Sequence, residues 1–263
     1  MALGKRNRSF GLALGGGAAR GIAHLGVLKV LGETGLKADY VVGTSAGSIV
    51  GALYAGGYSW ETIADVTRAL DWGDIVQPVF PRMGLVRADR LENRLVDLLG
   101  DRTIEELDIP FKATAVDLGR GELHVMDSGP IAPAVRASCS IPGIFEPVEH
   151  DGRLLVDGGV LNDVPLDICH DMGADVVLAV DLNSDMVREK TPENIFNVII
   201  ASFMIMVRTC RHKETGKDTI VIRPDLAGFN YYNLKRSDEL IQRGEAATRE
   251  VVGQLLKRVR RQP

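Results

Sequence analysis

The amino-acid sequence predicts an α/β fold, a three-layer α/β/α sandwich with a mainly parallel sheet. Short apolar runs rich in Val, Leu and Ile alternate along the chain with longer segments of helical periodicity. Several of the short runs are apolar at nearly every position, as expected for strands that helices cover on both faces. This alternation is typical of βα units with right-handed crossovers. A chain of 263 residues can bury a sizeable core, and we expect residues 1–263 to form one domain.

The apolar runs predict strands at Phe10–Leu14, Asp39–Val42, Phe111–Asp117, Glu122–Met126, Leu154–Val156, Val176–Asp181 and Thr219–Arg223. The helical periodicity predicts helices at Gly21–Leu31, Ser45–Ala55, Trp60–Leu70, Ala88–Leu99, Ile131–Ala137, Pro165–Met172, Glu193–Arg211 and, from about residue 237, Ser237–Arg258. The longest remaining stretches, Asp71–Arg87 and residues 184–192, are expected to be irregular loops.

Composition and charge exclude several classes of function. The chain has 31 Lys and Arg against 35 Asp and Glu, a net charge of −4 that disfavours broad electrostatic binding to nucleic acid. Aromatic residues make up 5% of the chain, which is sparse for a base-stacking surface. We find neither an export signal with a cleavage site nor an uninterrupted apolar stretch of about 18 residues. We therefore expect a cytoplasmic protein without a membrane span.

The three cysteines are Cys139, Cys169 and Cys210, an odd number without a CxxC pair or metal-ligand spacing. This usage disfavours a disulfide scaffold and a metal site, and it fits a reducing compartment. We expect all three to be small, partly buried apolar side chains.

The strongest local motif is Gly43-Thr44-Ser45-Ala46-Gly47, which matches G-x-S-x-G where a predicted strand passes into a predicted helix. A turn this tight requires small flanking residues and presents the serine hydroxyl at the end of the strand. The helix N-terminus behind it favours developing negative charge. The alternative is a serine that merely caps the helix. The strand-to-helix context favours Ser45 as a nucleophile.

A second motif, Gly15-Gly16-Gly17-Ala18-Ala19-Arg20-Gly21, joins the first predicted strand to the first helix. Residues without side chains leave backbone N–H groups open to a ligand, either a dinucleotide phosphate or the oxyanion of a tetrahedral intermediate. The dinucleotide spacing G-x-G-x-x-G is broken, because Arg20 stands where the last glycine belongs. With a serine turn on the next strand, the oxyanion hole is the favoured interpretation.

The third motif, Asp157-Gly158-Gly159, ends a predicted strand, where an aspartate can reach into a crevice at the edge of the sheet. Asp-Gly is also a common turn dipeptide, and spacing alone does not decide between the two. The histidines that follow, His170 and His212, do not lie on a loop after a strand, where a triad histidine belongs. A serine hydrolase without histidine needs another base, and a partly desolvated carboxylate can serve.

Together the three motifs resemble the patatin-like phospholipase family, within it the small stand-alone bacterial members. They occur in the family's order, and residues 137–145 (ASCSIPGIF) are similar to the apolar Pro-Gly segment that precedes the family's aspartate. The resemblance extends from Phe10 to about Arg223. It implies a Ser–Asp dyad, Ser45 as nucleophile and Asp157 as general base, that acts on lipid esters without a metal or a cofactor.

The resemblance also implies an oxyanion hole built from backbone N–H groups around Gly16, Gly17 and Ala18, with Arg20 orienting the loop. Many relatives open this loop with an acidic residue, whereas Leu14 stands here. The expected substrate is a phospholipid or a related lipid ester. The alternative function is a catalytically weak regulatory or scaffolding protein that keeps the fold.

The predicted helix Glu193–Arg211 is apolar around nearly its whole circumference. Such a helix either packs in the core or at a subunit contact, or forms a lip that faces a membrane or an acyl chain. The second interpretation predicts peripheral contact with a membrane.

Overall fold

The computed structural model describes residues 8–69, 71–78, 80, 82–184, 192–209 and 218–260. Its strands are β1 (Phe10–Leu14), β2 (Tyr40–Thr44), β3 (Gln77–Pro78), β4 (Gly84–Arg87), β5 (Phe111–Asp117), β6 (Glu122–Met126), β7 (Gly143–Phe145), β8 (Val148–His150), β9 (Arg153–Asp157), β10 (Val176–Val180) and β11 (Thr219–Ile222). Its helices are α1 (Ala23–Thr34), α2 (Ala46–Ala55), α3 (Trp60–Arg68), α4 (Asp89–Leu99), α5 (Ile131–Ser138), α6 (Leu166–Asp171), α7 (Ile195–Thr209) and α8 (Ser237–Arg260). Short 3-10 turns include η1 (Ala18–Ile22), η2 (Trp72–Asp74) and η4 (Gly158–Val160).

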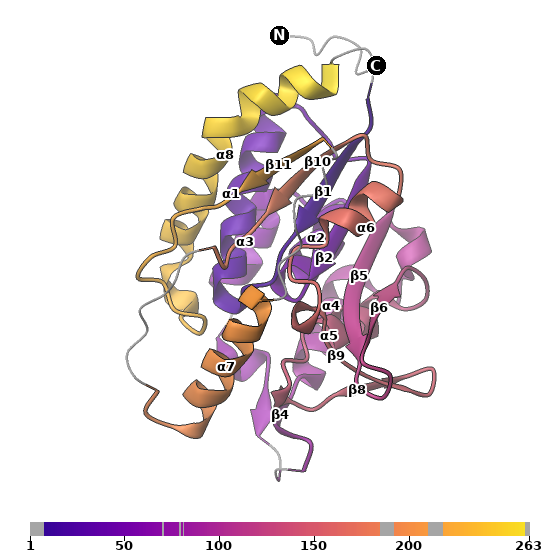
Figure 1. The fold of residues 1–263 in the computed structure, drawn as a ribbon, viewed down its shortest axis with the longest axis vertical. Helices are drawn as coiled ribbons and strands as arrows, with labels where there is room; N and C mark the ends of the chain where they lie inside the picture. Colours follow the sequence, from indigo (N-terminus) through magenta and orange to yellow (C-terminus); the bar gives the residue numbers. More distant parts are fainter. Residues whose placement is uncertain are drawn as a thin grey trace.

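The central sheet of the described chain has eight strands in the order β11-β10-β1-β2-β5-β9-β8, with β6 beside β5. Strands β11, β10, β1, β2 and β5 are parallel, whereas β6, β8 and β9 run antiparallel to their neighbours. Helices α1, α2 and α8 pack on one face of the sheet and α6 on the other (Figure 1). The predicted three-layer α/β/α fold with a mainly parallel sheet is confirmed.

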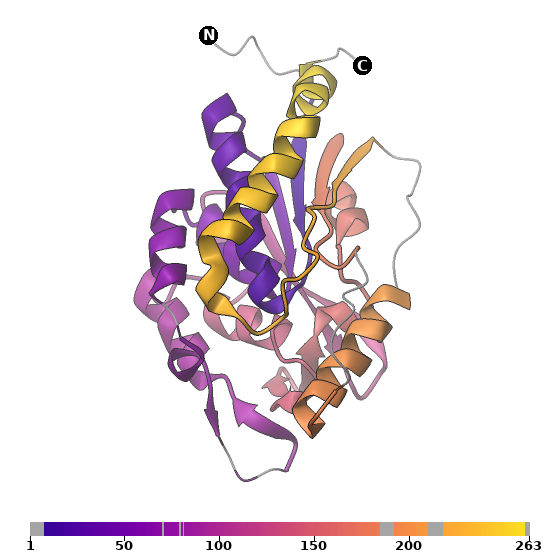
Figure 2. The same ribbon diagram turned by 90° about the vertical axis from the view of Figure 1, so that its left-hand side faces the viewer.

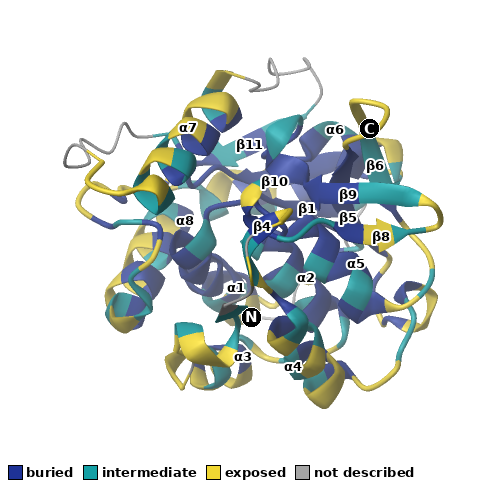
Figure 3. Cartoon of the chain, turned by 90° about the horizontal axis from the view of Figure 1, so that it is seen from below, coloured by how far each residue is buried: buried dark blue, intermediate teal, exposed yellow. Residues whose placement is uncertain are grey.

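Strand β1 shows why its sequence is apolar at nearly every position. Leu12 and Leu14 belong to the core on the α1 and α8 side, and Ala13 belongs to the smaller core under α6. Cys169 of α6 is fully buried there, and Cys139 is also buried with a free thiol, as predicted. Cys210 lies outside the described residues. Figure 3 shows the strands as a dark blue interior within helices whose outer faces are yellow.

The predicted element boundaries agree with the structure to within a few residues, but four short strands were not predicted. The segment Asp71–Arg87 is not an irregular loop throughout, because β3 and β4 form an antiparallel hairpin within it. Strand β4 also pairs in parallel with β7, which is more than fifty residues away in the chain. These strands have two to four residues each, too few for an alternating pattern, and long-range pairing defines them.

Two strands, β2 and β9, end next to each other along one edge of β5. Strand β2 pairs with the first half of β5, where Thr44 lies opposite Thr114. Strand β9 pairs with the second half in the opposite direction, where Asp157 lies opposite Ala115. Because β6 occupies the other edge of β5, β2 and β9 lie end to end along the same edge. The residue after β2, Ser45, therefore meets the last residue of β9.

Helices α1 and α8 approach each other so closely that two glycines are required at their contact (Figure 2). A Cβ atom on Gly26 would lie 2.0 Å from the carbonyl oxygen of Ile241, and one on Gly244 would lie 1.9 Å from that of Ala23. We expect Gly244→Ala to lower the free energy of unfolding by about 2 kcal/mol or more, because the backbones must separate.

The matched control is Gly253→Ala in the same helix, where a Cβ atom has no neighbour within 4 Å. This variant should be up to about 1 kcal/mol more stable than the wild type, because alanine favours a helix. Urea denaturation of both variants measures the difference, and equal stabilities would contradict the close packing.

Candidate active site

Ser45 occupies a strained turn between β2 and α2. Its backbone has φ 52° and ψ −127°, a conformation that non-glycine residues rarely adopt. A Cβ atom on Gly43 would lie 2.5 Å from the carbonyl oxygen of Gly47, and one on Gly47 would lie 2.1 Å from that of Leu14. The turn therefore requires both glycines of the G-x-S-x-G motif. Strain of this kind, at the passage from a strand into a helix, is typical of a nucleophile elbow.

Backbone hydrogen bonds hold Ser45 in this conformation. Its N–H donates to Oγ of Ser138 at 2.9 Å, and its carbonyl oxygen accepts the N–H of Ser48 at 2.8 Å. Its side chain does not cap the helix, since no cap hydrogen bond from it is present at the start of α2. Ser138 was not predicted, because it reaches Ser45 from α5 and no local motif connects the two.

Asp157 ends β9 and is completely buried. Its Oδ1 accepts the N–H of Gly159 at 2.8 Å, whereas no hydrogen bond of ordinary geometry reaches its Oδ2 within the described residues. Burial raises the pKa of Asp157 to about 7, while the nearby hydroxyl of Ser45 and the N–H of Gly159 oppose that rise. The carboxyl group is thus desolvated, and the hydroxyl of Ser45 lies close enough to it to oppose the rise of its pKa.

The glycine after Asp157 is dictated by the crowding between β9 and β5. A Cβ atom on Gly158 would lie 2.2 Å from Oγ1 of Thr114. The same threonine hydroxyl lies 2.7 Å from Oγ1 of Thr44, the residue before Ser45. This contact connects the two strand ends that carry Ser45 and Asp157.

The glycine-rich loop between β1 and η1 lies against Ser45, where a Cβ atom on Gly16 would be 3.2 Å from that of Ser45. The N–H of Gly15 donates to the carbonyl of Val180 and that of Gly16 to the carbonyl of Asp163. The N–H groups of Gly17 and Ala18 donate to no acceptor in the described parts of the chain. The expected oxyanion donors are therefore reduced to Gly17 and Ala18, because the N–H of Gly16 is already used.

Arg20 is completely buried and anchors this loop. Its guanidinium group donates to the carbonyl oxygen of Phe229 at 2.8 Å and to that of Leu182 at 3.1 Å. It also lies over the ring of Tyr231, 4.3 Å from the centroid. Its backbone N–H is occupied by the carbonyl of Gly17. Arg20 is thus placed to orient the loop and not to donate to an oxyanion.

Asp163, a buried acid that was not predicted, helps to hold the glycine-rich loop in place. Its Oδ2 accepts a hydrogen bond from Nδ2 of Asn183 at 2.9 Å, and the same amide donates to the carbonyl of Gly16 at 3.2 Å. Burial, opposed by the Asn183 hydrogen bond and aided by the charge of Asp157, raises the pKa of Asp163 to about 7. The sequence offers no motif for this pair, because the two residues come from different loops.

Two histidines have structural partners. His24 is buried with Nε2 2.8 Å from the carbonyl of Gly15, and burial lowers its pKa to about 4, so that the ring is neutral. His170 lies between the carbonyl of Ala174 and the hydroxyl of Thr219, both at 2.9 Å. His212 lies outside the described residues.

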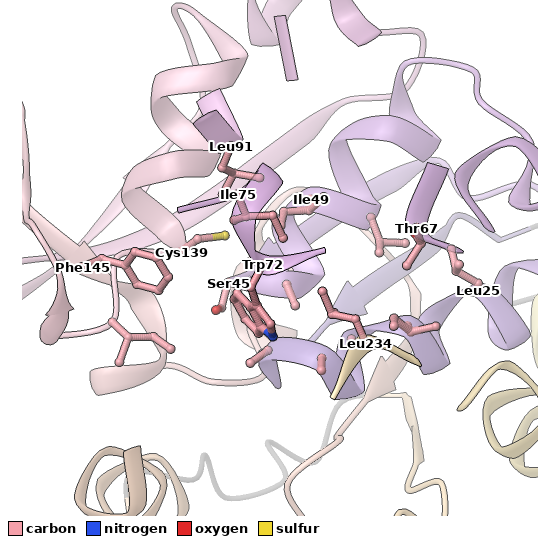
Figure 4. Close-up of a pocket in the computed structure, with 17 residues that line it drawn as sticks. Leu25, Ser45, Ile49, Thr67, Trp72, Ile75, Leu91, Cys139, Phe145 and Leu234 are labelled. Atoms are coloured by element: carbon pink, nitrogen blue, oxygen red, sulfur yellow. The ribbon is translucent and has the colours of Figure 1, made fainter. Parts of the chain in front are cut away.

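Ser45 borders an apolar cavity of about 800 Å³, its open mouth included. Figure 4 shows Ile49, Trp72, Leu91 and Phe145 among the side chains around it. Cys139 also lines the cavity, and burial raises the pKa of its thiol, which therefore stays neutral. The cavity contains no charged side chain among its described lining residues. It fits an apolar ligand next to the serine hydroxyl.

Comparison with known proteins assigns the chain to a family. The family model for patatin-like phospholipases matches residues 12–170, which include Ser45, Asp157 and the glycine-rich loop. The match covers more than half of the chain. The chain belongs to the patatin-like phospholipase family.

The relatives of this patatin-like protein include longer chains. An uncharacterised NTE family protein of Mycobacterium tuberculosis is 39% identical over 175 residues, 65% of this chain and 48% of that protein. A second one is 31% identical over 269 residues, 92% of this chain and 46% of that protein. The chain thus spans about half the length of these mycobacterial relatives.

Two solved structures share the patatin-like fold. VipD from Legionella pneumophila matches with a TM-score of 0.57 at 16% identity, over 95% of this chain and 67% of that one. ExoU from Pseudomonas aeruginosa, in complex with SpcU, matches with a TM-score of 0.55 at 18% identity, over 98% of this chain and 54% of that one. At these identities the similarity concerns the fold alone.

The buried position of Asp157 predicts a pH-dependent cost in stability. Its pKa is about 7 in the folded protein against an ordinary 3.8, so the folded state binds more protons between these values. The loss in the free energy of unfolding that comes from ionising buried Asp157 is therefore absent below about pH 4. It grows as the pH rises and reaches its full size above about pH 7. Asp157→Asn, which carries no charge, should be more stable than the wild type by roughly 4 kcal/mol at about pH 8.

Thermal and urea denaturation from about pH 4 to about pH 8 measure this difference. It should shrink to nothing at the acid end, where Asp157 is protonated in both states. The exposed residue Asp101 supplies the control variant Asp101→Asn, for which we expect no pH-dependent change. An Asp157→Asn variant that is less stable at the alkaline end would contradict the assignment.

Proposed function

We propose that this chain is a serine acyl hydrolase that cleaves ester bonds of phospholipids or related lipids through a Ser45–Asp157 dyad. The observation that carries the proposal is a strained serine whose hydroxyl lies near a completely buried carboxyl group and opposes the rise of its pKa. Membership of the patatin-like phospholipase family supports hydrolysis of a lipid. The dyad, the ester specificity and the phospholipase A-like reaction rest on the geometry of the site.

In the first half of the reaction, Oδ2 of Asp157 takes the proton of the Ser45 hydroxyl as Oγ attacks the ester carbonyl. The N–H groups of Gly17 and Ala18 donate to the oxyanion of the tetrahedral intermediate. Collapse of this intermediate breaks the bond to the alcohol oxygen, which leaves with the proton from Asp157. The acyl group remains esterified to Ser45.

In the second half, Asp157 takes a proton from a water molecule that attacks the acyl-enzyme carbonyl. The second tetrahedral intermediate releases the fatty acid, and the proton returns to Oγ of Ser45. A base with a pKa of about 7 suits both halves, because it is ionised in much of the population near neutral pH yet basic enough to accept the proton.

The apolar cavity next to Ser45 supports an acyl chain as the group that enters the site. Its lining side chains come from helices α1, α2, α3 and α4 and from the segment after α5. A hydrocarbon chain gains free energy by leaving water for such a cavity, whereas a charged group would lose its hydration there.

We also propose that the enzyme meets its lipid at a membrane surface through α7 and the tip of the β3–β4 hairpin. Helix α7 has no charged residue before Arg208, yet Ile195 is 68% and Val198 49% exposed. At the hairpin tip, Phe80 is 86% and Met83 54% exposed. Both elements lie at the same end of the molecule in Figure 1 and Figure 2. None of the described helices is long and apolar enough to cross a bilayer.

The first test is covalent labelling of the folded protein with a fluorophosphonate, followed by mass-spectrometric mapping of the adduct. We expect the adduct on Ser45, a rate roughly 100-fold lower in Asp157→Asn, and no adduct in Ser45→Ala. The control Ser59→Ala, at an exposed helix cap, should label like the wild type.

Absence of an adduct from the folded protein would contradict the dyad and favour a catalytically weak regulatory or scaffolding role. An adduct on any other residue would equally overturn the assignment of Ser45.

The second test concerns the membrane surface. Ile195→Asp combined with Val198→Asp should lower hydrolysis of phospholipid in vesicles by about tenfold, because charged side chains oppose insertion. Hydrolysis of a water-soluble short-chain ester should be unchanged. Gln254→Asp, an exposed change on α8, is the control. Equal loss on both substrates, or none on vesicles, would contradict the proposed surface.

A further inference from the structure

A second apolar cavity adjoins the one that Ser45 borders. It has a volume of about 1030 Å³, its open mouth included. The two cavities share Ala18, Trp72, Ile141 and Phe145 as lining residues. Ser45 lines the first cavity and not the second.

The wall between the two cavities is held in place. Nε1–H of Trp72 donates to the carbonyl oxygen of Tyr232 at 2.6 Å. Ala18 has φ 45° and belongs to the turn that Arg20 anchors through Phe229. A ligand that occupies both cavities therefore passes the shared lining residues, among them Ala18, whose N–H donates to no protein acceptor within the described residues.

An ester at Ser45 has an acyl arm and an alcohol arm, one on each side of the scissile bond, and each of the two cavities can take one of them. The acyl arm of the scissile carbonyl extends into the cavity that Ser45 borders. The second cavity is the space open to the alcohol arm, because it shares Ala18, Trp72, Ile141 and Phe145 with the first. The chemistry of that second cavity then decides what kind of alcohol the enzyme accepts.

The second cavity lies between α7 and the strands β4 and β7, with Val86, Ile144, Phe196 and Ile200 in its wall. None of its described lining residues is charged. A phosphate or ammonium group would lose its hydration there without an ionic partner, whereas a hydrocarbon chain would not. An alcohol arm that fills this space must itself carry an apolar chain.

We propose that this second cavity holds the uncleaved acyl chain of a two-chain glycerolipid while Ser45 attacks the other chain. The inference rests on the proposed function and adds the substrate class to it. Asn194, which is exposed, and Asn197 line the cavity at the start of α7, so a polar head group can stay hydrated there while the chain lies inside. The enzyme is thus a hydrolase for two-chain lipids rather than for single-chain lysolipids.

The experiment compares two substrates in mixed micelles, a diacyl phosphatidylcholine and a lysophosphatidylcholine with the same cleaved chain. Val86→Trp fills the second cavity from a half-buried position on β4. We expect kcat/KM for the diacyl lipid to fall about tenfold and that for the lysolipid to stay within about twofold. Ile49→Trp, which fills the first cavity, is the matched control and should lower both.

Equal losses on the two substrates with Val86→Trp, or no loss on the diacyl lipid, would overturn the proposal. A wild type that hydrolyses neither lipid nor a soluble ester contradicts the proposed function instead. In that case a binding measurement still tests whether the second cavity holds a second chain. A non-hydrolysable short-chain diether phosphatidylcholine should bind the wild type about tenfold more tightly than its single-chain counterpart, and Val86→Trp should abolish this advantage. Equal affinities of the two lipids for the wild type would overturn the inference.

Discussion

A carboxyl group without a charged partner in a dry interior is the constraint on which the site depends. Asp157 is completely buried, and within the part of the chain that the structure describes its ionised form is stabilised by the N–H of Gly159 and the hydroxyl of Ser45. Burial therefore makes it a stronger base than a surface aspartate. The rest of the fold keeps this carboxyl away from water and brings the turn at Ser45 to the end of its strand. The buried charge of Asp157 lowers the stability of the folded protein, and the same burial raises the basicity of the carboxylate.

The sheet supplies that placement through an unusual junction. Parallel β2 and antiparallel β9 share one edge of β5, so that their carboxyl-terminal ends meet at Thr114 and Ala115. Glycines permit the approach at each turn, and Ser138 and Asp163 hold the serine turn and the oxyanion loop from other elements. The two apolar cavities share Ala18 of that loop, so the proposed oxyanion hole lies where the two proposed chain sites meet.

Much of this could be predicted from sequence, because each part of it is local. The strands of the central sheet are apolar runs, and the Ser45, Gly15 and Asp157 motifs are written in consecutive residues. The residues that hold the serine turn and the glycine-rich loop could not be predicted, because Ser138, Asp163 and Asn183 reach the site from separate elements. The hairpin of β3 and β4 was not predicted for the same reason, since the pairing of β4 with β7 depends on the tertiary fold. The sequence also assigned Gly16 to the oxyanion hole, and only the structure shows its N–H bonded to Asp163.

The central claim is that burial turns Asp157 into a base that works near neutral pH. The most direct measurement is a nuclear magnetic resonance titration of carboxyl-carbon-labelled aspartates, with the Asp157 signal assigned by its loss in Asp157→Asn. The account predicts a midpoint for Asp157 near its pKa of about 7, well above those of exposed aspartates. A midpoint near the ordinary 3.8 would show that the carboxyl is hydrated or paired, and it would contradict the account.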